Sequence, residues 1–219
     1  MINKFIRAVA AGVMIGIAGA VYLAIGPPLG AILFSLGLIL ICTRGYNLYT
    51  GKIGYVQKPK ETVDMLLYIG GNAIGTWLVA ATQNVNTTEM ITAKLALPWW
   101  LVLIKAIGCG ILMYLAVDIY KTKQNYWGII TCIPAFILAG FEHSIADMFY
   151  IWLGGIYNWR VLEFICIVIL GNAIGANLHH LDKIKVKPKN KTSKNNVINE
   201  DLFGNPITKP AIDNGDFEF

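Results

Sequence analysis

The chain has 219 residues, of which 56% are hydrophobic and 14% are charged, whereas a soluble globular domain has about 25% charged residues. This composition excludes a disordered or collagen-like chain and argues against a water-soluble globule. The net charge of +5 does not indicate a nucleic-acid partner, because the lysines of 183–194 follow the last apolar segment, where anionic lipid headgroups attract basic side chains. We therefore expect a membrane-embedded body at 1–180 and a mobile, polar cytoplasmic tail at 181–219.

Six apolar segments, each of about the length that crosses a membrane, follow one another along the chain. They cover residues 4–25, 29–50, 64–83, 98–118, 127–153 and 160–180. The fifth is longer than a straight span requires, and the polar run 84–94 is predicted to be a loop. With the N-terminus inside, only Lys94 and Arg160 fall in outer loops. The positive-inside rule then places both termini in the cytoplasm of a multi-pass protein of the inner (plasma) membrane.

The second and fifth segments contain polar residues that a simple apolar span would lack. Residues 44–51 (Arg-Gly-Tyr-Asn-Leu-Tyr-Thr-Gly) end the second segment, and residues 140–148 (Gly-Phe-Glu-His-Ser-Ile-Ala-Asp-Met) lie inside the fifth. Interrupted helices occur at membrane depth only where they are buried in protein or line a cavity. An ionisable residue inside the membrane indicates a functional site by default. We therefore predict that the second and fifth segments form broken helices, and that these line a pathway through the membrane.

An internal repeat relates the two halves of the apolar region. The string Gly71-Asn72-Ala73-Ile74-Gly75 recurs as Gly171-Asn172-Ala173-Ile174-Gly175. Small residues at this spacing also favour close helix packing, but packing alone does not explain the duplication. Because each repeat holds three spans, the second must enter the membrane from the opposite side. We predict an all-α membrane protein with six transmembrane helices in an inverted 3+3 repeat, about 1–83 and about 98–180.

Residues 140–148 resemble the GFEHSxANM signature of the formate/nitrite transporter family. Residues 36–40 and 45–51 are similar to another of its conserved segments, and the two Gly-Asn-x-x-Gly strings resemble its third and sixth helices. The resemblance covers residues 1–180. It implies an aquaporin-like protomer within a homopentamer, in which each protomer has its own pore for small monovalent anions such as formate, nitrite or hydrosulfide.

The resemblance also assigns candidate pore residues. It implies an outer hydrophobic constriction at Phe34 and Phe136, and an inner one at Leu38 and Leu48. It further implies that Thr50 faces His143, and that Lys94 matches the family's lysine before helix 4.

This sequence departs from the family pattern at several positions. Asp147 stands where the signature has Asn, Gly110 where an Asn normally follows Cys, Asn47 where an acid is usual and Tyr49 where Phe is usual. These departures leave the choice among anions open, with the hydrosulfide-conducting branch as the specific alternative.

The expected mechanism combines the apolar constrictions with a central histidine. A bare anion between apolar rings is costly, whereas its neutral acid crosses at a lower cost. His143 is the one side chain of the spans whose ordinary pKa lies near neutrality, so we expect it to assist protonation of the anion. Protons, the anion and membrane lipid are then the partners.

An alternative from another class is a membrane-embedded enzyme that uses Glu142, His143 and Asp147 as metal ligands or acid–base groups. A catalytic metal site usually has three protein ligands, and the adjacent residues Glu142 and His143 point in different directions on a helix. No second His/Asp/Glu cluster in the spans completes such a site. We therefore expect no catalytic residues, no metal and no cofactor.

Overall fold

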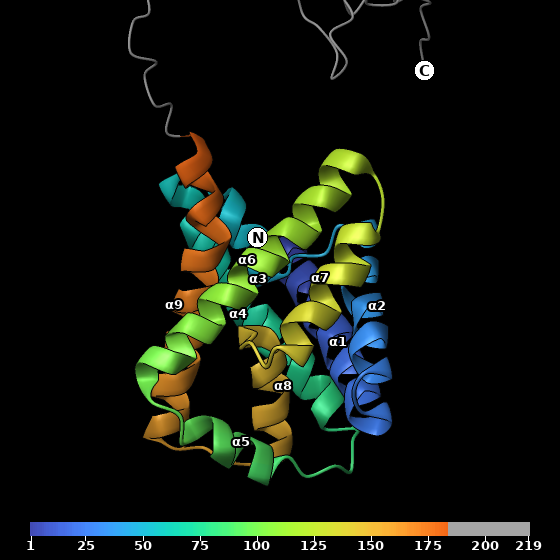
Figure 1. Cartoon of the computed structure of the whole chain (residues 1–219), viewed down its shortest axis with the longest axis vertical. Coiled ribbons are helices and arrows are strands. Elements are labelled where there is room, and N and C mark those ends of the chain that lie inside the picture. The colour runs from blue at the N-terminus through green and yellow to red at the C-terminus, as the bar shows by residue number, and fades with distance from the viewer. Residues whose placement is uncertain (184–219) are drawn as a thin grey trace, which may run out of the picture. The chain divides into compact units, whose positions relative to one another are not determined.

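The computed structural model describes residues 1–183, which form a wholly helical unit (Figure 1). Most of the predicted tail therefore lies outside the described residues. The α-helices are α1 (Ile2–Ile25), α2 (Leu29–Arg44), α3 (Tyr49–Lys52), α4 (Pro59–Ala80), α5 (Thr88–Leu95), α6 (Trp99–Lys123), α7 (Trp127–Leu138), α8 (Ser144–Gly154) and α9 (Trp159–Asn177). Two 3-10 helices, η1 (Ile53–Tyr55) and η2 (Leu178–Lys183), follow α3 and α9.

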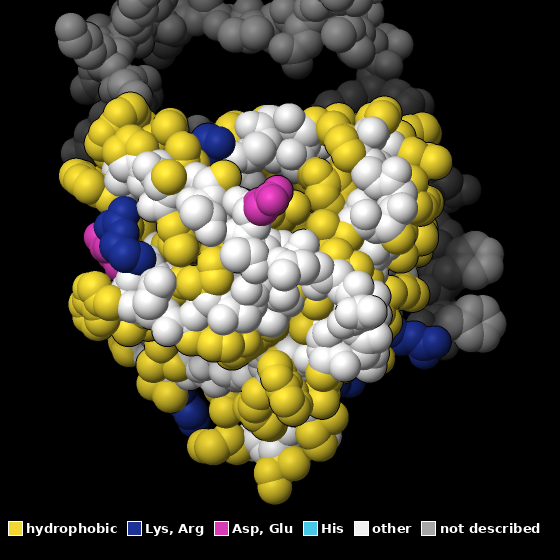
Figure 2. All heavy atoms as spheres, turned by 90° about the horizontal axis from the view of Figure 1, so that it is seen from below, with side chains coloured by type: hydrophobic (Ala, Val, Ile, Leu, Met, Phe, Trp, Pro, Cys, Tyr) yellow, Lys and Arg dark blue, Asp and Glu magenta, His cyan; other side chains and the backbone are white. Residues whose placement is uncertain are grey.

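Four continuous helices of residues 1–183 are long and apolar enough to cross a membrane: α1, α4, α6 and the stretch Trp159–Leu181 that begins with α9. The bent pair formed by α2 and the α3–η1 segment meets the same test, with an angle of 57° between its parts. Large apolar side chains such as Leu66 and Trp127 lie on the outside. Figure 2, which looks onto the end that carries α5, shows hydrophobic and uncharged side chains over most of that face. The exposed large apolar side chains of the helices fit lipid or further protein rather than water.

The second and fifth apolar segments are broken, as the sequence predicts. Residues 45–48 separate α2 from α3, and residues 139–143 separate α7 from α8. Each break contains one glycine in the left-handed region, Gly45 at φ 66° and Gly140 at φ 65°. A residue with a Cβ is strained in this conformation. The two glycines thus end α2 and allow the chain to turn away after α7.

The two halves of the unit pack in the same way. α1 lies against α4 and α2, and α6 lies against α9 and α7. The duplicated glycines allow the close contacts: a Cβ on Gly75 would collide with the carbonyl oxygen of Val9, and one on Gly175 with that of Ile107. The parts that follow the breaks cross over, because α8 packs against α4 while η1 packs against α9. The segment that follows each break therefore packs against a helix of the opposite half.

The polar run predicted as a loop at 84–94 is wrong over most of its length, because Thr88–Leu95 forms α5. This helix packs against α8 and α9. Thr87 donates its hydroxyl to the carbonyl oxygen of Tyr150 at 2.6 Å, and Thr88 donates its own to that of Gly154 at 3.0 Å. These bonds fix α5 along α8, so that its last turn, with Lys94, lies next to the second break.

Candidate functional site

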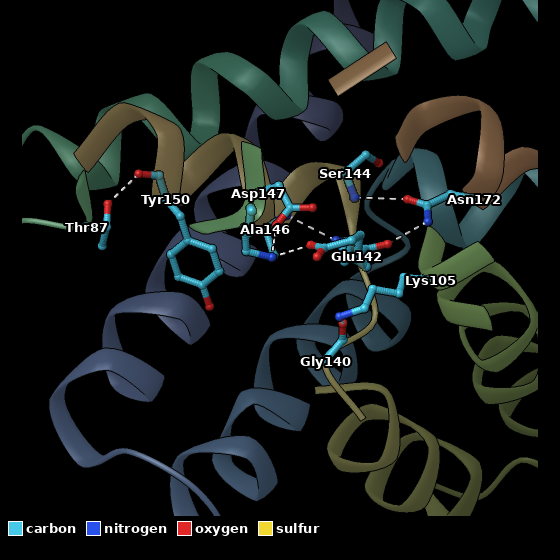
Figure 3. Close-up of polar contacts among 11 residues, drawn as sticks. Thr87, Lys105, Gly140, Glu142, Ser144, Ala146, Asp147, Tyr150 and Asn172 are labelled. Carbon is cyan, nitrogen blue, oxygen red and sulfur yellow. Dashed lines mark hydrogen bonds and ion pairs between the residues drawn. The ribbon is translucent and has the colours of Figure 1, made fainter. Parts of the chain in front are cut away.

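Two asparagines from the repeated strings hold the two breaks. Asn72 donates to the carbonyl oxygens of Ala8 and Asn47 and accepts from the backbone N–H of Tyr49, at 2.7, 3.0 and 2.9 Å. Asn172 donates to the carbonyl oxygens of Ala106 and Glu142 and accepts from the N–H of Ser144, each at 2.9 Å (Figure 3). Both asparagines are fully buried. Their amides supply the partners that the interrupted helices leave missing at the centre of the unit.

His143 and Thr50, predicted to face each other, are in contact. Thr50 Oγ1 lies 2.9 Å from Nε2 of His143, and both side chains are buried. His143 is also the N-cap of α8, since its Nδ1 accepts from the backbone N–H of Ala146 at 3.1 Å. The imidazole is thus bonded at both nitrogens, on one side to the first broken segment and on the other to its own helix.

These two bonds determine which tautomer of the His143 imidazole fits the structure. An imidazole nitrogen that accepts from a backbone N–H carries no proton, so the neutral ring has its proton on Nε2. That N–H then donates to Thr50 Oγ1. A proton can be added only at Nδ1, where it would displace the bond from Ala146. The ring held in this way can donate a hydrogen bond but has no proton to give away.

Lys94, predicted in an outer loop, instead extends into the unit from α5. Its Nζ donates to Oε2 of Glu142 and lies 3.0 Å from Oδ1 of Asp147. Both carboxyl groups belong to buried residues, each 2% exposed. Figure 3 shows Glu142 and Asp147 close together beside the second break. We call Lys94, Glu142 and Asp147 the lysine cluster.

Two cavities lie along α2. One of about 170 Å³ is lined by Phe34, Phe136, Lys94, His143 and Asp147, among others. The other, of about 150 Å³, is lined by Leu38, Leu48, Gly51, Lys52 and Lys121, among others. We call them the phenylalanine cavity and the leucine cavity.

The residues predicted for the two constrictions therefore sort into two separate cavities. Phe34 and Leu38 are one helical turn apart on α2, which is a rise of about 6 Å. Phe136 also stacks on the imidazole of His143, with 5.6 Å between ring centroids. Thr50 stands between Leu48 and Gly51, which line the leucine cavity, and bonds His143, which lines the other. The Thr50–His143 pair thus links the walls of both.

Charged side chains of the second half have partners of their own. The side chain of Glu142 pairs with Lys94, and Asn172 binds the carbonyl oxygen of Glu142. Asp147 also pairs with Lys94. Lys105 is half-buried and donates to the carbonyl oxygen of Gly140 at 3.1 Å. Glu163 pairs with Arg160 on the same helix, at 2.6 Å.

Within residues 1–183, no group of three or more His, Cys, Asp or Glu side chains is arranged to hold a metal ion. Glu142 and Asp147 have a lysine between them, and His143 uses both ring nitrogens in other bonds. The described residues thus give no support to the metal-enzyme alternative.

The profile of the formate/nitrite transporter family matches residues 1–180. A relative described as a probable formate transporter, from Methanothermobacter thermautotrophicus, is 28% identical over 65% of this chain and 68% of its own length. The uncharacterized transporter YrhG of Bacillus subtilis (strain 168) is 32% identical over 67% of this chain and 66% of its own length. The match thus spans about two thirds of each relative.

Solved structures share the fold. One, titled a pentameric formate channel with formate bound, superposes with a TM-score of 0.71 at 23% identity, over 83% of this chain and 94% of its own. Another, titled an FNT family ion channel, has the same TM-score of 0.71 at 19% identity, over 81% and 87% of the two chains.

Proposed function

The chain belongs to the formate/nitrite transporter family, and from this premise we propose that it is a membrane channel that passes small monovalent anions through the phenylalanine and leucine cavities. Its family and structural neighbours are transporters and channels, not enzymes. The observation that carries the proposal is the buried Thr50–His143 pair, which links the walls of both cavities.

The proposed path has apolar walls with a polar step at its centre. Lys94 lines the phenylalanine cavity and Lys52 and Lys121 line the leucine cavity, so an ammonium group lies at each end of the path, and that of Lys94 is paired with Glu142 and Asp147. Between them, the hydrogen-bonded Thr50–His143 pair is the polar group of the path. The phenylalanines and leucines solvate no charge, which favours passage of the neutral acid over the bare anion.

In this proposal the central histidine assists protonation of the anion, and its bonds set a condition for that role. A neutral ring cannot give up its Nε2 proton without becoming an imidazolate. His143 must first gain a proton at Nδ1, which breaks the cap bond from Ala146 N–H. Donation by His143 therefore requires a second state of the ring.

We further propose six spans in an inverted 3+3 repeat, with the α5 end outside and both termini in the cytoplasm. The matched bonds of Asn72 and Asn172 support the duplication. The outer loops in this orientation hold Lys94 and Arg160 as their only basic residues, which supports the orientation. The exposed tryptophans that begin α6, α7 and α9 fit membrane interfaces. We also propose that the chain lies in the inner membrane and forms a homopentamer, the latter by analogy with the pentameric neighbour.

Flux into proteoliposomes tests the channel. We expect proteoliposomes that contain the purified protein to take up at least one of formate, nitrite and hydrosulfide. The anion with the fastest uptake is the preferred one, and fastest uptake of hydrosulfide would support the hydrosulfide alternative. Phe136→Ala should raise flux or relax selectivity, because it removes a ring that lines the cavity and stacks on His143. Lack of uptake of all three anions by a folded, assembled protein would contradict the proposal.

The role of His143 is tested by His143→Asn, which keeps a good N-cap for α8 but cannot titrate. We expect the pH dependence of flux to weaken while assembly is retained. An unchanged pH profile would exclude a protonation role for His143 and leave it as a hydrogen-bond donor.

A further inference from the structure

The lysine cluster has one more acid than it has bases. Lys94 carries one positive charge, and Glu142 and Asp147 carry two negative charges when both are ionised. Both acids are 2% exposed, and an uncompensated charge at such a depth is strongly disfavoured. The cluster becomes neutral when one of the carboxyl groups holds a proton.

The bonds of the cluster indicate which carboxyl group is neutral. Glu142 accepts from Lys94 Nζ through Oε2, while Asp147 contacts the same nitrogen through Oδ1 only. Among the described residues, Oδ2 of Asp147 is buried and has no hydrogen-bond partner. A neutral acid can accept from the lysine with its carbonyl oxygen and keep its O–H for a further acceptor.

The position of Asp147 makes that O–H available to an anion, because Asp147 lines the phenylalanine cavity together with His143 and Lys94. His143 in its observed bonds has no proton to donate. We propose that Asp147 is the residue that gives the entering anion its proton, so that the lysine cluster is a proton-binding site on the anion path. This inference rests on the proposed anion channel.

The transfer balances in charge and atoms. Neutral Asp147 transfers its proton to the anion, which gives the Asp147 carboxylate and the neutral acid. The net charge of the lysine cluster changes from zero to −1. Lys94 stabilises the carboxylate at 3.0 Å until a proton from water at the same end restores the acid. The neutral acid passes the apolar constriction and releases its proton beyond it. One proton thus accompanies each anion.

Other ionisable groups surround the cluster and must be counted in any titration. They are Tyr22 of α1, Cys109 of α6, and His143 and Tyr150 beside Asp147 on its own segment. Tyrosine and cysteine are ordinarily neutral at pH 7, and His143 in its observed bonds is a neutral ring. The balance of the site therefore depends on Lys94 and the two acids.

Infrared spectroscopy of the full-length protein in liposomes detects the proton without transport. We expect the C=O stretch of a neutral carboxylic acid at pH 7, shifted by ¹³C labelling of aspartate and absent in Asp147→Asn. Asp64→Asn should leave it unchanged, because Asp64 is paired with Lys4 outside the cluster. Absence of the band, or a band that shifts only with labelled glutamate, would overturn the assignment.

Transport then tests the use of that proton. Asp147→Asn gives the cluster the same net charge as its protonated form, so the electric field that the entering anion meets is kept while the transferable proton is lost. We expect proton-coupled uptake to fall by about 10²-fold, with Asp64→Asn at the wild-type rate. Wild-type proton-coupled uptake by Asp147→Asn would overturn the proposal although the channel itself stands. Absence of uptake by the wild type would instead contradict the channel and leave the infrared result valid.

Discussion

The break at 45–48 and the break at 139–143 share a backbone but differ in their side chains. Each has a glycine at φ near 65° and a backbone N–H that bonds five residues back, from Tyr46 to Ile41 at 2.9 Å and from Phe141 to Phe136 at 3.0 Å. Each is held by a buried asparagine through three hydrogen bonds.

The side chains at matching places have different chemistry. Asn47 occupies the place of Glu142, because its carbonyl oxygen is bound by Asn72 as that of Glu142 is bound by Asn172. Leu48 then matches His143. The second break also has α5 beside it, with Lys94, whereas residues 56–58 lead directly from η1 into α4. The scaffold is thus duplicated, and the ionisable chemistry belongs to one copy.

The strongest test of the shared scaffold is to remove each asparagine in turn. Asn72→Leu and Asn172→Leu each remove three buried hydrogen bonds and leave two backbone groups of the break without that partner, at about 1–3 kcal/mol for each group. We expect both variants to lose thermal stability and assembly to a similar extent, measured by unfolding and size-exclusion in detergent. Asn125→Ala, which loses a single exposed bond to Trp127 N–H, is the control. A severe loss in only one of the two leucine variants would show that the halves are not equivalent.

A substitution of Lys94 tests the part that is not duplicated. Lys94→Met leaves Glu142 and Asp147 buried without their cation, and removal of one partner from a buried ion pair costs about 3–5 kcal/mol. The additional changes Glu142→Gln and Asp147→Asn should restore much of the stability, as measured by thermal unfolding. Lys4→Met, at an exposed ion pair, should have a small effect. If the triple variant were no more stable than Lys94→Met, charge compensation would not be the role of Lys94.

The two glycines allow a smaller, symmetric test. Gly45→Ala and Gly140→Ala force a Cβ into the left-handed region at about 1–2 kcal/mol each, although no atom lies closer than 3.6 Å to either new Cβ. Unfolding midpoints should fall by similar amounts. Gly70→Ala, in the interior of α4 with open space around its Cβ, should be neutral or stabilising. Unequal losses would show that one break tolerates a change of conformation.

The smallest expected effect concerns the polar side chain of the first break. Asn47 Nδ2 donates to the carbonyl oxygen of Lys4 at 3.0 Å, so Asn47→Ala should cost about 1 kcal/mol. The pH profile of anion flux should remain that of the wild type, because Asn47 does not titrate. A shifted pH profile would place part of the proton chemistry in the first break.

The sequence predicted the scaffold because its signals are local. Gly45 and Gly140 within apolar segments indicated the breaks, and the duplicated Gly-Asn-x-x-Gly strings indicated matching helices before any contact was known. Family resemblance supplied the pairing of Thr50 with His143, which periodicity alone does not give. The described contacts agree with it.

The lysine cluster could not be derived in the same way, because its members are far apart in the chain. A local pattern carries no information about a contact between Lys94 and Asp147. Helix signals for α5 were nevertheless present, with Thr87 at its N-cap, Glu89 in its first turn and Lys94 in its last. The polarity of 84–94 concealed them, since a short polar helix and a loop have similar composition.

The crossing of the parts that follow the breaks has a consequence for biosynthesis. Residues 1–83 leave the ribosome before η1 can meet α9 and before α4 can meet α8. During that interval Asn72 can bond the first break, but α9, against which η1 packs, has not yet been made. A nascent chain of this kind reaches its final packing only after α9 has been made, so a membrane chaperone or insertase that shields the polar face of residues 45–48 would act before that point.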